Sequence, residues 1–276
     1  MSLFRLWFKG FSIAGLFLLG LLTVSTLMPL LRRYCGRRAD HYCSAIVRHW
    51  HQVVCRILNL HLHISGSLPQ KAGLVVANHI SWLDIIAIGA QSPCLFVAKE
   101  EIAAWPVIGR LARNIGTLFI RRGDAAQTAT ACETMTWLLR RGNLMVLFPE
   151  GTTTSGHQVQ RFHGKLFLPA QLAGVTVQAI ALRYKGEAAQ PAPFIGDDAF
   201  LPHLLSILKL KRIDLDLHYC PPLPNGLRRD QLARAARLQI LESLNSVRAR
   251  PLPQSITNRH PKVTVCSTSL HQKPVI

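Results

Sequence analysis

Apolar positions follow two patterns along the chain, and the first is an unbroken run near the amino terminus. Between Gly10 and Leu31 no side chain is charged. The body of this run, FSIAGLFLLGLLTVSTLMPLL, has 21 residues, enough for a helix to cross the roughly 30 Å hydrocarbon layer of a bilayer. We therefore expect a membrane helix at this end of the chain.

The charges that flank this run favour a retained anchor. Arg5 and Lys9 lie on one side, whereas the other side carries arginines at positions 32, 33, 37 and 38. The heavier positive flank of a membrane helix stays in the cytoplasm, so we expect the chain on the cytoplasmic face of the inner membrane. A cleaved signal peptide would need a small-x-small site, but Arg-Arg-Tyr-Cys follows. Pro29 and the glycines leave a spanning and a re-entrant helix both open.

Residues 39–60 carry apolar side chains at three- and four-residue spacing, which predicts an amphipathic helix. Histidines and arginines occupy its other face. Two placements fit this pattern: a helix that lies on anionic lipid, and a helix packed on the following domain. In both cases we expect its histidines, His41, His49 and His51, at the surface.

The second pattern begins at Leu60, where short apolar runs alternate with amphipathic ones. The strand-like runs are 60–65, 73–77, 94–98, 117–121, 144–148, 175–183 and 213–219. The helical runs are 82–90, 105–114, 125–140, 164–173 and 228–248. Several strands are apolar throughout, as strands covered on both faces are. The order predicts an α/β fold, with a layered, mixed and largely parallel sheet flanked by helices and an N-terminal membrane helix or helix pair.

Composition divides the chain into three segments and indicates a class of partner. Residues 1–58 would form the anchor and amphipathic helix, residues 59–250 the α/β domain, and residues 251–276 a disordered basic tail. The formal net charge of +18 implies an anionic partner, such as phospholipid, a phosphorylated substrate or nucleic acid. The sequence lacks the patterns of nucleic-acid-binding modules. Its seven cysteines include no CxxC pair, which argues against disulfides and a metal site.

Candidate chemistry begins with Asn78-His79-Ile80-Ser81-Trp82-Leu83-Asp84, directly after the apolar run LVVA. Active sites of α/β folds gather at such strand ends. Ser81 is placed to cap the next helix with its hydroxyl. Asp84 can then fold back to His79, fix the tautomer of the imidazole and raise the basicity of its other nitrogen. That nitrogen would remove a proton from an alcohol. The rival interpretation is a structural histidine beside a helix cap.

Two further motifs follow predicted strands. Phe148-Pro149-Glu150-Gly151-Thr152-Thr153-Thr154-Ser155-Gly156 supplies glycines and hydroxyls that suit phosphate or oxyanion binding. Glu150 would contact a substrate hydroxyl or orient a basic side chain. Gly116-Thr117-Leu118-Phe119-Ile120-Arg121-Arg122 ends in two guanidinium groups, which suit bidentate contact with phosphate. Taken singly, each motif also fits an ordinary loop or a solvated strand end.

In this order and spacing, NHISWLD, GTLFIRR and FPEGT resemble the 1-acylglycerol-3-phosphate acyltransferase family of glycerolipid enzymes. The resemblance covers about Leu60 to Tyr184 and the amino-terminal helix pair. It implies that His79 is the general base and Asp84 its partner. Residues implied to bind the acceptor are Gly116, Phe119, Arg121, Glu150, Gly151 and Thr152.

The implied reaction moves a fatty acyl group from acyl-CoA or acyl carrier protein to the sn-2 hydroxyl of 1-acylglycerol-3-phosphate, without cofactor or metal. The partners would be membrane phospholipid, the lysophospholipid acceptor and the acyl donor, and not nucleic acid. Main-chain N–H groups near the helix start or near Gly151 would stabilise the tetrahedral oxyanion.

One position departs from the family pattern. The family commonly reads FPEGTR, whereas Thr153 stands at the arginine position here. FPEGTT also resembles acyltransferases that acylate lyso-ornithine lipid, an acceptor without phosphate. Lys165, in RFHGKLF, would partly replace the missing charge for a lysophosphatidate acceptor. An alternative of another class is a non-catalytic membrane-binding protein on the same fold.

Overall fold

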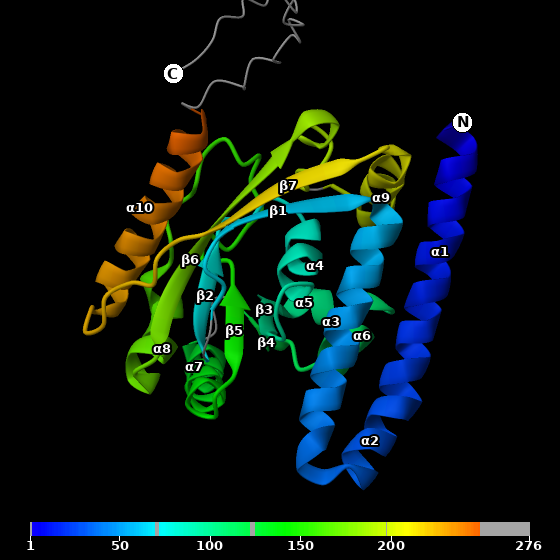
Figure 1. Ribbon diagram of the computed structural model, residues 1–276. Helices are drawn as coiled ribbons and strands as arrows, with labels where there is room; N and C mark the ends of the chain where they lie inside the picture. Colours follow the sequence, from blue (N-terminus) through cyan, green and yellow to red (C-terminus); the bar gives the residue numbers. More distant parts are fainter. Residues whose placement is uncertain (1, 70–71, 122–124, 197, 249–276) are drawn as a thin grey trace, which may run out of the picture.

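Seven strands form one mixed sheet in the computed structural model, which describes residues 2–69, 72–121, 125–196 and 198–248 (Figure 1). Their order across the sheet is β1-β7-β6-β2-β5-β3-β4. The five strands from β6 to β4 are parallel to one another, whereas β7 and β1 run in the opposite direction. The predicted mixed, largely parallel sheet is confirmed. The predicted tail, 251–276, and Arg122 lie outside the described residues.

The observed strands lie within one or two residues of the predicted runs. They are β1 Leu60–Gly66, β2 Gly73–Ala77, β3 Leu95–Lys99, β4 Leu118–Ile120, β5 Leu144–Leu147, β6 Thr176–Lys185 and β7 Ile213–Tyr219. The agreement follows from burial: all residues of β2 and most of β6 are shielded from solvent. A strand covered on both faces is apolar throughout and is therefore visible in the sequence.

Helices cover both faces of the sheet and create two cores. Val75 and Ala77 of β2 contribute to one core, and Leu74 and Val76 to the other, as the alternation of a strand requires. The first face carries α1 (Ser2–Leu22), α3 (Ala39–Leu58), α4 (Leu83–Gly89) and α9 (Phe200–Lys209). The second carries α7 (Ala125–Arg140), α8 (Leu168–Ala173) and α10 (Arg229–Arg248). The candidate residues lie at the edge between these layers.

Short helices account for most differences from the predicted elements. α5 (Glu100–Ala103) is a single turn and α9 contains a proline, and neither helix was predicted. α6 (Ile108–Asn114) begins three residues later than expected, after the Trp105-Pro106 turn. The predicted helix at 164–173 begins as the 3₁₀ turn Gly164–Phe167. Two further 3₁₀ turns cover Gly36–Arg38 and Gly186–Ala188. One-turn elements carry too few residues to show a period.

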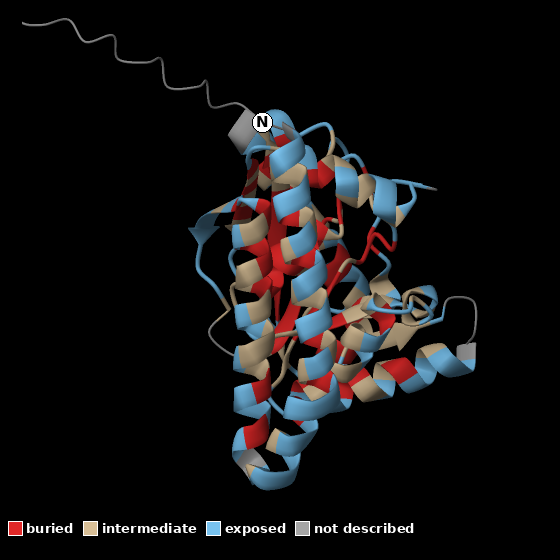
Figure 2. Ribbon diagram, turned by 90° about the vertical axis from the view of Figure 1, so that its right-hand side faces the viewer, coloured by how far each residue is buried: buried red, intermediate tan, exposed pale blue. Residues whose placement is uncertain are grey.

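The predicted membrane helix is continuous through α1, the π turn Thr23–Leu27 and α2 (Met28–Tyr34). Its segment Leu3–Tyr34 is long and apolar enough to cross a membrane. One side is nevertheless docked on the folded body, because Lys9 Nζ donates hydrogen bonds to the carbonyls of Leu58 and Leu210, each at 2.9 Å. These carbonyls end α3 and α9, where helix dipoles favour a cation. Figure 2 shows the outer side of this helix exposed.

α3 is packed on α1, α2 and α4, which supports the second of its two predicted placements. His41 and His49 are exposed as expected, but the expectation for His51 is wrong. His51 is only 4% exposed, between the rings of Trp50 and Phe96. Gly89 makes the room, because a Cβ there would lie 2.7 Å from the His51 ring.

Candidate active site

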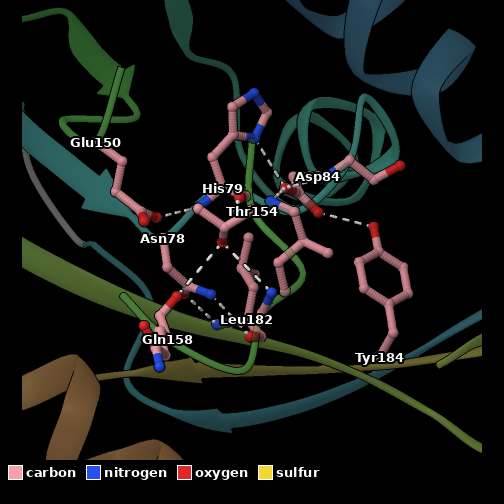
Figure 3. A network of polar contacts seen from close by, with 11 residues as sticks. Asn78, His79, Asp84, Glu150, Thr154, Gln158, Leu182 and Tyr184 are labelled. Atoms are coloured by element: carbon pink, nitrogen blue, oxygen red, sulfur yellow. Dashed lines mark hydrogen bonds and ion pairs between the residues drawn. The ribbon is translucent and has the colours of Figure 1, made fainter. Parts of the chain in front are cut away.

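Asn78 holds the chain in place as it leaves β2. Its buried side-chain amide donates to the carbonyl of Leu182 at 3.0 Å and accepts the N–H of the same residue at 2.8 Å. The side chain thus continues the pairing between β2 and β6 after β2 has ended. The next residue, His79, is therefore presented at the carboxyl edge of the parallel strands (Figure 3).

His79 and Asp84 are in contact, as the sequence predicts. Nδ1 of the imidazole lies 2.9 Å from Oδ2 of the carboxylate. The aspartate folds back because α4 begins at Leu83, so that Asp84 occupies its first turn while His79 remains on the preceding loop. In Figure 3 one ring nitrogen faces Asp84 and the other points away from it.

The predicted cap by Ser81 is wrong. The Ser81 hydroxyl makes no capping bond to α4. Instead, Oδ2 of Asp84 accepts the main-chain N–H groups of Ile80 at 2.7 Å and Ser81 at 2.9 Å. A carboxylate is the better acceptor for N–H groups at a helix start. These two N–H groups are therefore occupied and do not form the oxyanion site expected near the helix start.

Tyr184 is a further hydrogen-bond donor to Asp84, and it was not among the site residues predicted from the sequence. Its hydroxyl donates to Oδ1 of Asp84 at 2.7 Å. Burial, and next the charge of Asp84, raise the pKa of Tyr184 well above its usual value, so the phenol stays a donor. Tyr184 shares the inward face of β6 with Ile180 and Leu182. A buried phenol needs a hydrogen-bond partner. A tyrosine on the apolar face of a strand was therefore the signal that the sequence offered.

The imidazole of His79 lies on the ring of Phe148, with centroids 3.8 Å apart and planes 12° from parallel. Its side chain keeps 17% exposure, whereas that of Asp84 is fully buried. The ring thus has one face covered by Phe148 and one edge fixed by Asp84, while the side chain as a whole keeps some contact with solvent. This is the geometry that an acid–base group needs, because a substrate must reach the free nitrogen.

Glu150 does not present its carboxylate to a substrate. It is only 4% exposed, and it accepts the N–H of His79 at 2.8 Å and the N–H of Gln160 at 2.7 Å. Burial raises the pKa of this carboxyl above its usual value, and the two N–H bonds oppose the rise. The expected contact with a substrate hydroxyl is replaced by a brace that joins the β5 loop to the His79 turn.

The rest of the β5 loop lies against the same turn. The N–H of Thr154 donates to the carbonyl of His79 at 2.8 Å (Figure 3). Gly156 packs so closely on Ile80 that a Cβ would lie 2.8 Å from its side chain. Gly151 has φ +76°, and its N–H donates to the carbonyl of Phe148, so this N–H too is occupied. Thr152 is exposed beside it.

The third motif ends at the same edge of the sheet but is not part of the His79 network. Gly116 turns the chain with φ +88° before β4. Phe119 lies under the guanidinium of Arg113, 6.0 Å from the ring centre. Arg121 donates from Nε to Oε2 of Glu100, at the carboxyl end of the neighbouring strand β3. The arginine expected to meet a phosphate is thus paired with an acid.

Comparison with known proteins places this arrangement in a family. Residues 59–183 match the family model described as Acyltransferase. A lyso-ornithine lipid O-acyltransferase of Pseudomonas aeruginosa is 38% identical over 240 residues, which cover 86% of this chain and 92% of the relative. The chain belongs to the acyltransferase family. The recognition made from NHISWLD, GTLFIRR and FPEGT is thereby confirmed.

The acyltransferase family also supplies relatives with another acceptor in their names. A 1-acyl-sn-glycerol-3-phosphate acyltransferase of Neisseria gonorrhoeae is 36% identical over 170 residues, 59% of this chain and 65% of the relative. The crystal structure of the 1-acyl-sn-glycerophosphate acyltransferase PlsC of Thermotoga maritima superposes with a TM-score of 0.66 at 20% identity, covering 91% of this chain and 98% of that one. The superposition on PlsC establishes the shared fold.

Proposed function

We propose that this acyltransferase moves a fatty acyl group from a thioester donor to a lysolipid hydroxyl, with His79 as the general base. The 2.9 Å contact between His79 and Asp84 carries the proposal. Asp84 receives two N–H bonds and one O–H bond besides the imidazole, which favours the acceptor-only carboxylate. The proton therefore lies on Nδ1 of His79, and Nε2 carries the free lone pair.

In the proposed reaction, Nε2 of His79 takes the proton of the acceptor hydroxyl. The oxygen then attacks the thioester carbonyl, and a tetrahedral intermediate forms. Collapse of this intermediate breaks the carbon–sulfur bond, and the imidazolium returns its proton to the departing thiolate. Acyl-CoA or acyl carrier protein would supply the thioester.

For the acceptor we propose lyso-ornithine lipid rather than the lysophosphatidate expected from the motifs alone. The relative that spans nearly the whole chain carries that acceptor in its name. Thr153 stands where a phosphate-binding arginine is common, and Arg121 is already paired with Glu100. A dianionic phosphate monoester would meet a nearby carboxylate here, which disfavours its binding.

Acylation of 1-acylglycerol-3-phosphate is the second candidate. It is favoured by the retained GTLFIRR motif and by the Neisseria relatives. Lys165 is exposed in the 3₁₀ turn that follows the FPEGTT loop, so it is available to a phosphate.

An acceptor panel tests the proposal. The purified full chain in detergent is offered lyso-ornithine lipid or lysophosphatidate, each with acyl-CoA and with acyl carrier protein, and products are identified by mass spectrometry. We expect conversion of lyso-ornithine lipid, and a loss of about 10²- to 10⁴-fold in His79→Ala. Full activity of His79→Ala would refute the mechanism and support a non-catalytic role for the chain. Conversion of lysophosphatidate alone would refute the acceptor.

A further inference from the structure

Arg237, on α10, holds the far end of the loop that follows β5. Its guanidinium donates three hydrogen bonds to main-chain carbonyls. Nη2 donates to Val159 at 2.8 Å, and Nε donates to Val159 at 3.1 Å and to Gln160 at 3.0 Å. The side chain of Val159 is buried in the same core as the inner side of α10. Arg237 therefore joins the last helix of the domain to the loop that contains Glu150.

The peptide group that Arg237 contacts also binds Glu150. The carbonyl of Val159 and the N–H of Gln160 belong to one planar peptide group. This N–H donates to Oε2 of Glu150, and the N–H of His79 donates to Oε1 of the same carboxylate. A hydrogen bond accepted by the carbonyl polarises the peptide group and strengthens the bond that its N–H donates. A cation, a peptide dipole and a carboxylate are thus connected in series, and the series ends at the main chain of His79.

The buried carboxylate of Glu150 needs this support, because burial removes the water that would stabilise its charge. Among the residues that the structure describes, no salt bridge includes Glu150 or Arg237. The ionisable groups that act on Glu150 directly are His79, which lowers its pKa, and Asp84, which raises it. The guanidinium acts through the intervening peptide group instead of through a direct ion pair.

We propose that Arg237 is a positioning residue for acyl transfer, which acts through Glu150 on the main chain of His79. The proposal rests on His79 as the proposed general base. The loop holds both ends of the His79 main chain, because Glu150 binds its N–H and Thr154 binds its carbonyl. A shift of the loop would therefore move the imidazole, and a displacement of about 1 Å in an active site can cost about 10²-fold in rate.

The first test measures kcat and KM in detergent with the lysolipid that the wild type converts. Arg237→Gln should lower kcat about tenfold, as the loss of a charge-assisted hydrogen bond predicts, and should leave KM near the wild-type value. Arg237→Lys keeps a cation and should lower kcat only about twofold. Arg234→Gln, at an exposed position on the same helix, is the control and should match the wild type. Thermal unfolding checks that each variant is folded.

The pH profile separates positioning from general damage. In Arg237→Gln the N–H of Gln160 is a weaker donor, so the pKa of Glu150 should rise further and its protonation should open the brace. The acid limb of the kcat profile should therefore move to higher pH in Arg237→Gln and stay in place in Arg234→Gln.

A double-mutant cycle with Glu150→Gln tests the connection itself. Glu150→Gln removes the carboxylate on which Arg237 acts, so Arg237→Gln should then change kcat less than about twofold. Should Arg237→Gln fail to fold, Arg237→Lys takes its place in the cycle, with its loss expected only while Glu150 is present.

Three results would overturn the positioning role alone: a wild-type kcat in Arg237→Gln, equal losses in Arg237→Lys and Arg237→Gln, or losses that multiply fully with that of Glu150→Gln. Full activity of His79→Ala would overturn the positioning role together with the proposed base.

Discussion

Asp84 is the residue on which the candidate site is organised. It has no exposed surface, yet it receives four hydrogen bonds, from His79, Ile80, Ser81 and Tyr184. Burial of a charge is costly unless donors replace the lost water. Here the same donors fix the turn before α4 and orient the imidazole, so one carboxylate orders both the main chain and the proposed base.

Tyr184→Phe should lower kcat about tenfold while the KM for the acceptor stays near the wild-type value. A hydrogen bond to a charged group contributes about 1.5–3 kcal/mol, and the variant loses it at Asp84 and not at the substrate. Without this donor the carboxylate attracts the imidazolium more strongly, so the acid limb of the kcat/KM profile should move to higher pH.

The matched control is Tyr219→Phe, a buried tyrosine on β7. Its pH profile should follow the wild type. An unchanged acid limb in Tyr184→Phe, together with a reduced melting temperature, would assign Tyr184 a structural role only.

Packing between helices decides the protonation state of His51, which the sequence alone places at the surface. His51 of α3 lies against Gly89 of α4 and away from water. Burial lowers the pKa of His51 to about 4 from a usual value of 6.5. The fold therefore keeps this imidazole neutral, and the contact between α3 and α4 depends on it.

Stability should fall as pH is lowered from 6.5 to 4, because the unfolded chain then binds a proton that the folded chain excludes. A shift of this size corresponds to about 3 kcal/mol. Denaturant unfolding in detergent at a series of pH values measures it. His51→Leu should remove this part of the pH dependence.

His49→Leu is the control on the same helix, because His49 is exposed. The free energy of unfolding of His49→Leu should depend on pH as that of the wild type does. If His51→Leu showed the same pH dependence of the unfolding free energy as the wild type, His51 would not be the group that excludes the proton.

At the scale of the whole molecule, α1 has an inner side that is docked on the protein and an outer side that is exposed. Its inner side is held by Lys9, which binds the ends of α3 and α9. Its outer side exposes large apolar residues, which include Phe4, Trp7, Phe8 and Phe11. Aromatic and apolar side chains in this arrangement enter the interface of a lipid layer. Such a surface, in a chain with a net charge of +18, suits a membrane with anionic lipids.

Trp7→Ser combined with Phe11→Ser should weaken binding to vesicles with anionic phospholipid by about tenfold. Cosedimentation measures the bound fraction. Activity in detergent should be unchanged, because both side chains point away from the body of the protein. Leu238→Ser, at an exposed position on α10 across the sheet, is the control. Equal sedimentation of the wild type, the double variant and Leu238→Ser would refute the proposed membrane surface.

Local patterns determined the elements and the central pair. Largely apolar runs marked β2 and β6, because both faces of these two strands are covered. His79 and Asp84 lie five residues apart, so one turn suffices to bring them together, and this contact was predicted. The resemblance of three motifs then gave the family.

Tertiary structure decided which polar groups meet. Tyr184 reaches Asp84 from 100 residues away, Glu150 reaches His79 from 71 residues away, and Glu100 reaches Arg121 across two strands. These contacts depend on the order β6-β2-β5-β3-β4, which puts distant strand ends on one edge. The same packing buried His51 and turned Glu150 from an expected substrate contact into a brace. A sequence shows the period of its own segments, whereas a contact between distant segments exists only once the sheet has formed.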